Sequence, residues 1–346
     1  QDKVTYHTSS SFPRFQDNSS GWLEILRDCG LQFDFIAYSH VEDGQLIGKD
    51  YDTFVMPMSV ALSDREIDQI ALFVQKGGTV IADALPGAMD EHCAFRNSSK
   101  LQELFGVKTA KSSATEITTA DGQPKLKLAG AKRLKPGKGK PTLAVNNYGQ
   151  GKAILLNYFH HTYSQDKLDG TSGPALENLR AVLAETGKKP KISLTGAGGV
   201  PVSGCERYLF NNGGTRLLGL VPDMGRAGAE QIEVRLDSEY AIYDVRARRY
   251  LGNGDRFRTE IEPGVPRLFA FVDGRITGLE LQAPSSAKLG QEIALNFHTT
   301  GAANLRSVAC VTVTDPLGQV RAIYGGNRDI EGSSGAAFFR TALNDP

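Results

Sequence analysis

Seven acidic and histidine side chains are of the types that bind metals or hydrogen-bond sugars, and they are His7, Asp83, Asp90, Glu91, His92, His160 and His161. Imidazole and carboxylate groups are common metal ligands. No spacing among the seven matches a known ligand motif. Two interpretations stay open: a metal or sugar site, or polar loop residues that cap helices or face a neighbouring subunit. The sequence therefore assigns no catalytic, cofactor-binding or metal-binding residue.

These side chains are candidates because of where they fall relative to the expected strands. His160 and His161 follow an apolar run at 153–157, Asp83 follows another at 79–82, and His7 lies in a short one at 4–8. Ligand crevices of open α/β sheets form at the carboxyl ends of the strands. We expect the candidates to gather on one rim there.

Residues 1–190 alternate strand and helix patterns. Apolar residues spaced as on one face of a helix precede Gly30, where the helix is expected to end. Continuous apolar runs typical of buried parallel strands follow. The expected elements are a strand at Val4–Thr8, a helix on Trp22, Ile25, Leu26 and Cys29, and strands at Phe33–Tyr38, Thr53–Met58, Thr79–Ala82 and Ala153–Leu156.

The clearest local signal is a capping box at Ser63 and Glu66, in which the hydroxyl and carboxylate satisfy each other's backbone amides. An apolar stripe follows on Ile67, Ile70, Ala71 and Val74, and Gly77-Gly78 ends the helix. A second helix of this type, with Pro174 near its start, ends at Gly187. Repeated strand–helix–strand units predict a mostly parallel sheet with helices on both faces.

From residue 191 the pattern changes to strands joined by turns. An antiparallel β-sandwich is expected at 191–274 and an immunoglobulin-like sandwich at 275–346. The expected strands of the first are Tyr208–Phe210, Arg216–Val221, Gln231–Leu236, Tyr240–Val245, Phe257–Ile261 and Arg267–Val272. The immunoglobulin-like sandwich is expected to be incomplete, because the about seven strands of such a domain need roughly 100 residues and the segment 275–346 is shorter.

An ordered set of segments in the first half resembles the trimerisation domain of family 42 β-galactosidases. The set is Tyr51–Met58, Ala61–Asp64, Phe73–Asp83, Asp90–His92, Leu104–Val107 and Gly149–Ala153. The resemblance covers roughly residues 1–190 and implies a flavodoxin-like, class I glutamine amidotransferase-like α/β fold. It also implies self-association, with a trimer favoured.

The resemblance implies no catalytic residue in this chain. Family 42 enzymes carry their catalytic glutamates on a separate (β/α)8 barrel, which needs about 200 residues or more, and the sandwich-like remainder cannot supply it. The related amidotransferases place a nucleophilic Cys on a turn that would fall near Asp83-Ala84, where neither residue is a thiol. Cys93 lies about ten residues further on, and it is either a reactive nucleophile or a passive thiol.

The composition limits the partners. Lys and Arg number 39, as do Asp and Glu, so a general nucleic-acid binder is not expected. The basic stretch from Lys125 to Lys140 reads as a solvated loop or a contact for an anionic partner.

No apolar run is long enough to span a membrane. The four cysteines, Cys29, Cys93, Cys205 and Cys310, are scattered, so a zinc site is unexpected and no disulfide framework is indicated. The compartment stays open, with an extracellular or periplasmic location favoured.

Three functions follow for testing. The favoured one is a non-catalytic oligomerisation or scaffold region of a β-galactosidase-like protein. The first alternative is a carbohydrate-binding module that uses Tyr240, Tyr243, Tyr250 and Phe257 for stacking, although aromatic residues also favour strands. The second is a hydrolase or an amidotransferase-like enzyme on the α/β domain. The first residue, Gln1, and the short last sandwich also suggest a fragment of a longer protein.

Overall fold

The computed structural model describes residues 14–97, 100–109, 126–134, 143–187, 189–302 and 305–342. The expected strand at 4–8, with its candidate His7, lies outside the described residues, as do parts of the basic stretch at 125–140. The chain divides into two compact units, residues 1–190 and residues 191–346.

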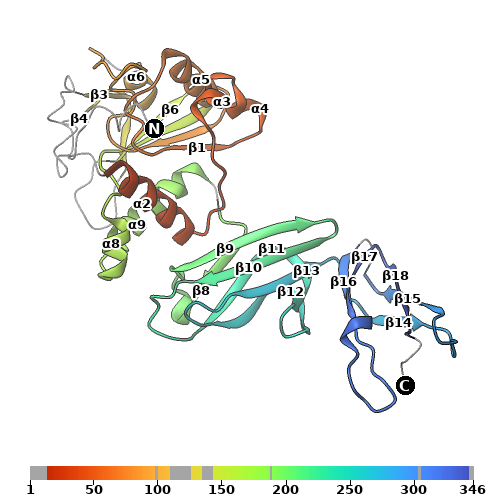
Figure 1. The fold of residues 1–346 in the computed structure, drawn as a ribbon. Coiled ribbons are helices and arrows are strands. Elements are labelled where there is room, and N and C mark those ends of the chain that lie inside the picture. Colours follow the sequence, from red (N-terminus) through yellow and green to blue (C-terminus); the bar gives the residue numbers. More distant parts are fainter. Residues whose placement is uncertain are drawn as a thin grey trace. The chain divides into compact units, whose positions relative to one another are not determined.

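A five-stranded mixed sheet forms the centre of the first unit (Figure 1). Three neighbouring strands run parallel: β1 (Thr53–Met56), β2 (Thr79–Ala82) and β7 (Gly151–Leu156). Two antiparallel strands extend the sheet beyond β7: β6 (Leu143–Tyr148) and β5 (Lys132–Leu134). The predicted α/β architecture with parallel strands is therefore present. Two further strands, β3 (Val107–Thr109) and β4 (Leu126–Leu128), pair with each other.

Helices cover both faces of this sheet (Figure 1). The first face packs against α3 (Tyr38–Glu42), α4 (Gln45–Gly48), α5 (Asp64–Gln75) and α6 (Leu101–Phe105). The opposite face packs against α2 (Arg14–Asp28), α8 (Tyr163–Leu168) and α9 (Gly173–Thr186). None of the helices in the described part of the chain combines the length and apolar character that a membrane crossing requires.

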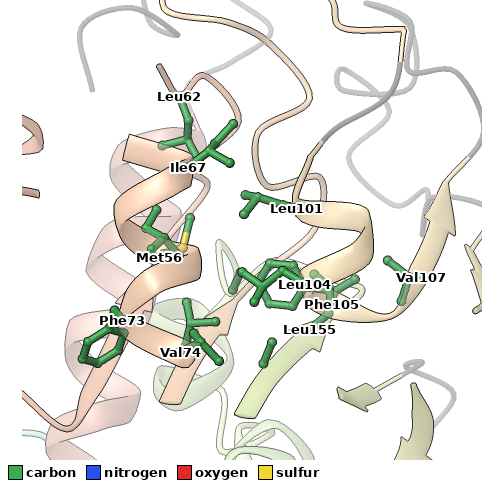
Figure 2. Close-up of a cluster of buried hydrophobic side chains, with 14 of the residues drawn as sticks. Met56, Leu62, Ile67, Phe73, Val74, Leu101, Leu104, Phe105, Val107 and Leu155 are labelled. Atoms are coloured by element: carbon green, nitrogen blue, oxygen red, sulfur yellow. The ribbon is translucent and has the colours of Figure 1, made fainter. Parts of the chain in front are cut away.

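Helix α5 begins as the sequence predicts. The Ser63 hydroxyl accepts a 3.1 Å hydrogen bond from the Glu66 amide, and the Glu66 carboxylate accepts one of 2.7 Å from the Ser63 amide. Its apolar residues are buried in the unit's own core, where Val74 lies on the side of α6 and β7 (Figure 2). This stripe is therefore covered within one chain and is not available as a subunit contact.

Two local predictions in this unit are wrong. Residues 31–37 form no strand, because no neighbouring segment among the described residues supplies the hydrogen bonds that define one, and the helix α3 starts at Tyr38. The 53–58 run is shorter and less buried than expected, because β1 is the edge of the described sheet and only Met56 in it is fully buried. Helix α2 also begins at Arg14, two turns before its first predicted position.

The second unit is antiparallel β-structure, as predicted. One sheet has the strand order β12-β11-β13-β10-β9, and β8 also pairs with β11. Its strands are β8 (Ser193–Thr195), β9 (Cys205–Asn212), β10 (Thr215–Pro222), β11 (Glu230–Asp244), β12 (Arg249–Ile261) and β13 (Arg267–Val272). The two strands expected at 231–245 are one long strand, with a register shift between Arg235 and Tyr240.

A second antiparallel sheet of this unit has the order β14-β15-β18-β17-β16. Its strands are β14 (Gly278–Gln282), β15 (Glu292–Thr300), β16 (Arg306–Val311), β17 (Gly326–Glu331) and β18 (Ser334–Arg340). One cluster of buried side chains, Phe297, Ile330 and Ala337, packs on it. Leu279 and Leu281 on β14 are 65% and 62% exposed. This sheet therefore buries less apolar surface than a two-layered sandwich would.

Candidate functional site

Asp83 is the centre of a buried polar cluster at the carboxyl ends of β1, β2 and β7. It directly follows β2 and is 1% exposed. Its Oδ2 accepts hydrogen bonds from the Asn18 amide at 2.7 Å and from the Trp22 indole at 2.9 Å. Its Oδ1 accepts one of 2.7 Å from the backbone amide of Met58, which has a φ of 43°. A left-handed backbone at a non-glycine residue is uncommon, and the Asp83 bond stabilises it.

Asn18 links this carboxylate to the segment after β7. Its side-chain oxygen accepts a 2.6 Å hydrogen bond from the backbone amide of His160, which is 2% exposed. The neighbouring helix residue Gly21 allows the close approach, because a Cβ there would lie 2.0 Å from the His160 carbonyl oxygen. The ring of His160 meets the Trp22 ring edge-on, with centroids 4.6 Å apart. Helix α2 is thus docked on two strand ends at once.

Burial controls the protonation of both titratable groups. Removal from water raises the pKa of Asp83 to about 7, although the Asn18, Trp22 and Met58 donors act to lower it. Burial, with a smaller contribution from the neighbouring His161, lowers the pKa of His160 to about 3. His160 is therefore neutral at physiological pH, and Asp83 is close to its titration point.

An apolar loop covers this cluster. Leu85, Ala88 and Met89 are buried together with Met58 and Val60, and side chains of Phe15, Cys93, Phe95 and Phe159 pack against them. Arg96 fixes the far end of the loop, since its guanidinium donates to the Leu62 carbonyl at 2.8 Å and pairs with Asp64 at 2.7 Å. The Asp83 side chain therefore lies beneath a packed cap.

The remaining predicted rim residues do not join Asp83 and His160. Asp90 accepts hydrogen bonds from the His92 and Ala94 backbone amides at 2.9 and 2.8 Å, which hold its pKa below the usual range. The side chains of Glu91 and His92 are 41% and 84% exposed and lie 3.9 Å apart. Their geometry is that of a loop turn. Within the described ranges, no three His, Cys, Asp or Glu side chains are grouped so as to hold a metal ion.

Sequence reasoning missed Asn18 and Gly21. Asn18 lies one turn before Trp22 on the apolar stripe of α2, where a polar residue indicates a buried hydrogen bond. Gly21 is a glycine inside a helix, which is unfavourable unless another backbone approaches closely. These two signals together would have indicated a docking contact on this face of the helix.

The aromatic residues proposed for sugar stacking form no exposed row. Phe257 is 8% exposed and packs on Phe269 with ring centroids 4.7 Å apart. The rings of Tyr243 and Tyr250 pack together, and the Arg275 guanidinium lies 4.5 Å from the Tyr250 centroid. Phe257 is therefore a core residue, and the two tyrosines form part of the packing between neighbouring strands.

The first unit also has a counterpart among known domains. Residues 6–123 match the β-galactosidase trimerisation domain. The match includes helix α2, the strands β1 and β2, Asp83 and the loop that covers it. No curated protein sequence matches the chain.

Solved β-galactosidases share the fold. A family 42 β-galactosidase from G. stearothermophilus, solved as a catalytic mutant, has a TM-score of 0.55 and 13% identity over 77% of this chain. The β-galactosidase from Bacillus circulans sp. alkalophilus has a TM-score of 0.54 and 15% identity over 75% of this chain. The β-galactosidase from Rahnella sp. R3 has a TM-score of 0.51 and 18% identity over 73% of this chain. This chain covers only 37%, 38% and 36% of those chains, respectively.

Proposed function

We propose that this chain is a non-catalytic assembly region of a β-galactosidase-like protein, in which the α/β unit self-associates as a trimer. The match of residues 6–123 to a trimerisation domain carries the proposal. The β-units would extend the scaffold beside a catalytic partner or a further part of the same protein.

The closed crevice supports a role without catalysis. An enzyme of the amidotransferase type needs an accessible thiol on the turn after β2, with a base to activate it. Here that turn carries Asp83 and Ala84, which are both 1% exposed. The parallel strands and the position of this turn are compatible with an amidotransferase-like fold that has lost its chemistry.

Two measurements on the purified chain test the proposal. Light scattering at micromolar concentration should give the mass of a trimer, because repeated identical contacts usually close into a ring. Assays of glutaminase and β-galactosidase turnover should give no activity. A monodisperse monomer would remove the assembly role, and turnover of about 1 s⁻¹ would identify an enzyme instead.

A sugar-binding role is a second candidate, on different residues from those predicted. The rings of Tyr208 and Phe210 lie nearly parallel on β9, with an angle of 14° and centroids 6.3 Å apart. Phe210 is 53% exposed, so its face is available for stacking. Calorimetric titration with galactose oligosaccharides tests this candidate. Binding that is lost in Phe210→Ala would support it, and the absence of binding by the unaltered chain would exclude it for these sugars.

A further inference from the structure

The turn between β11 and β12 carries three arginines in four residues. They are Arg246, Arg248 and Arg249, and all three are exposed. The turn is well anchored, because the Asp244 carboxylate accepts a 2.9 Å hydrogen bond from the Ala247 backbone amide. Asp244 and Arg249 also face each other where the two strands pair. The three positive charges are therefore carried by an ordered turn.

A fourth arginine extends this positive surface. The exposed Arg275 has its guanidinium 4.5 Å from the centroid of the Tyr250 ring, and Tyr250 directly follows Arg249 in the chain. An aromatic face attracts a cation held over it, so the ring keeps this guanidinium beside the turn. We call Arg246, Arg248, Arg249 and Arg275 the arginine cluster.

The charge of the arginine cluster is not neutralised locally. None of its four side chains forms an ion pair with a carboxylate among the described residues. Asp244 is used by the turn and lies 3.9 Å from Arg267, and Arg248 donates to the thiol of Cys310, a weak acceptor. The exposed Asp273 precedes Arg275 by two residues without pairing with it. Like charges repel one another, so the cluster costs stability that a bound anion would return.

The chemistry of the cluster fits a chain-like ligand with several oxyanion groups. A guanidinium donates two parallel N–H bonds to a carboxylate or a sulfate. The core of a protein interface is about two-thirds apolar, whereas Val245, at 39% exposure, is the exposed large hydrophobic side chain of residues 244–250. A general nucleic-acid binder needs a basic excess, and the formal net charge here is zero. A polysaccharide that bears acidic groups needs neither an apolar contact area nor a large basic surface.

We propose that the arginine cluster binds an anionic polysaccharide through the sulfate or carboxylate groups of that polymer. The proposal is independent of trimer formation, which concerns the first unit. It is also separate from the sugar-binding candidate at Phe210 on β9, because that candidate depends on ring stacking and this one on charge.

Dextran sulfate and dextran are matched probes, since they share one backbone and differ in charge. Calorimetric titration of the full chain should show binding of dextran sulfate that weakens as salt is added, and no binding of dextran. Polygalacturonate tests carboxylate groups in the same way. The triple variant Arg246→Gln, Arg248→Gln and Arg249→Gln should raise the Kd about tenfold, at a factor of about two for each exposed pair.

A second triple variant removes the same charge from arginines that already have carboxylate partners. It is Arg216→Gln, Arg235→Gln and Arg340→Gln, whose partners are Asp237, Asp255 and Glu292. This control should leave the Kd within about twofold, and circular dichroism should show both variants folded. Equal effects of the two variants would overturn the proposal. So would tighter binding of polyglutamate, which would indicate an acidic protein partner, or no binding of either anionic polysaccharide.

Discussion

Asn18 and His160 lie 142 positions apart in the chain, and a 2.6 Å hydrogen bond joins them. The amide group of Asn18 is used at both ends, because its nitrogen donates to Asp83 while its oxygen accepts from the His160 backbone. One side chain of α2 therefore satisfies a buried carboxylate and a buried amide on two neighbouring strand ends.

We expect Asn18→Ala to lower the free energy of unfolding by roughly 2–4 kcal/mol. The substitution leaves the His160 amide unsatisfied and takes one of three donors from Asp83, and each buried loss costs about 1–3 kcal/mol. Urea unfolding followed by circular dichroism measures the change. Asn211→Ala, at an exposed position of β9, should change the free energy by less than about 0.5 kcal/mol. Equal losses in the two variants would contradict the role of Asn18.

The Asp83 carboxyl should make stability fall as pH rises. Its pKa is about 7 in the folded protein and near the ordinary 3.8 in the unfolded chain, so folding takes up a proton between these values. The contribution of Asp83 is then greatest below about pH 4 and is lost by about pH 7, at roughly 1.4 kcal/mol per pH unit. The free-energy difference between the unaltered chain and Asp83→Asn, measured at pH 4.5, 5.5 and 6.5, isolates this slope.

His160 should act in the opposite direction over the same range. Its pKa is about 3 when folded and near 6.5 when unfolded, so its contribution is present above about pH 6.5 and is lost as pH falls towards 3. The two slopes offset each other in the unaltered chain from about pH 4 to 6.5. The stability of Asp83→Asn alone should therefore rise with pH there. A flat difference curve for the pair of proteins would contradict the Asp83 shift, and an Asp83→Asn stability that does not rise with pH would contradict the His160 shift.

Phe35 and Tyr38 are the residues we expect at the subunit contact. They are 78% and 58% exposed, and they are the large exposed hydrophobic side chains among the described residues of the matched 6–123 segment. Truncating an aromatic anchor at an interface commonly costs 2 kcal/mol or more, about thirtyfold in affinity. Phe35→Ser should shift light-scattering mass towards the monomer at micromolar concentration. Leu168→Ser, equally exposed but outside that segment, should leave the mass unchanged.

Gly151 should tolerate no side chain. A Cβ there would lie 2.1 Å from the Gly78 carbonyl oxygen and 2.3 Å from that of Val74, so the start of β7 and the end of α5 would have to separate. We expect Gly151→Ala to destabilise the chain by about 3 kcal/mol, at the upper end of the range for overpacking. Gly173→Ala is the control, because nothing lies within 4 Å of its Cβ position. A thermal midpoint for Gly151→Ala equal to that of the control would refute the steric explanation.

Local patterns predicted the elements whose determinants lie within a few residues. Ser63 and Glu66 form a capping box in sequence and in space, and Gly187 ends α9 with a φ of 72°, as its residue type suggests. The strand expected at 33–38 failed because strands depend on a neighbour, which no local pattern supplies. The segment 33–38 has alternating apolar side chains, but without a neighbouring strand Phe35 is exposed to solvent.

The candidate site was predicted only in part for the same reason. Asp83 and His160 were placed at the carboxyl ends of neighbouring strands, and both are found there. Their burial could not be inferred, because the covering loop owes its position to Arg96 and its contacts with Leu62 and Asp64. The path of that loop carries Asp90, Glu91 and His92 away from Asp83. Their residue types alone could not predict this distance.

The long sequence separation between Asn18 and His160 has a consequence during synthesis. Ribosomes add about 5–20 residues per second, so Asn18 of α2 leaves the exit tunnel roughly seven to thirty seconds before His160, which lies 142 positions later. For that interval its fully buried side chains, Trp22 and Ile25, lack part of the surface that covers them, because β7 and α9 follow later in the chain. A nascent chain in this state is a substrate for chaperones that bind short apolar segments. Helix α2 is thus made long before the last of the residues that secure it.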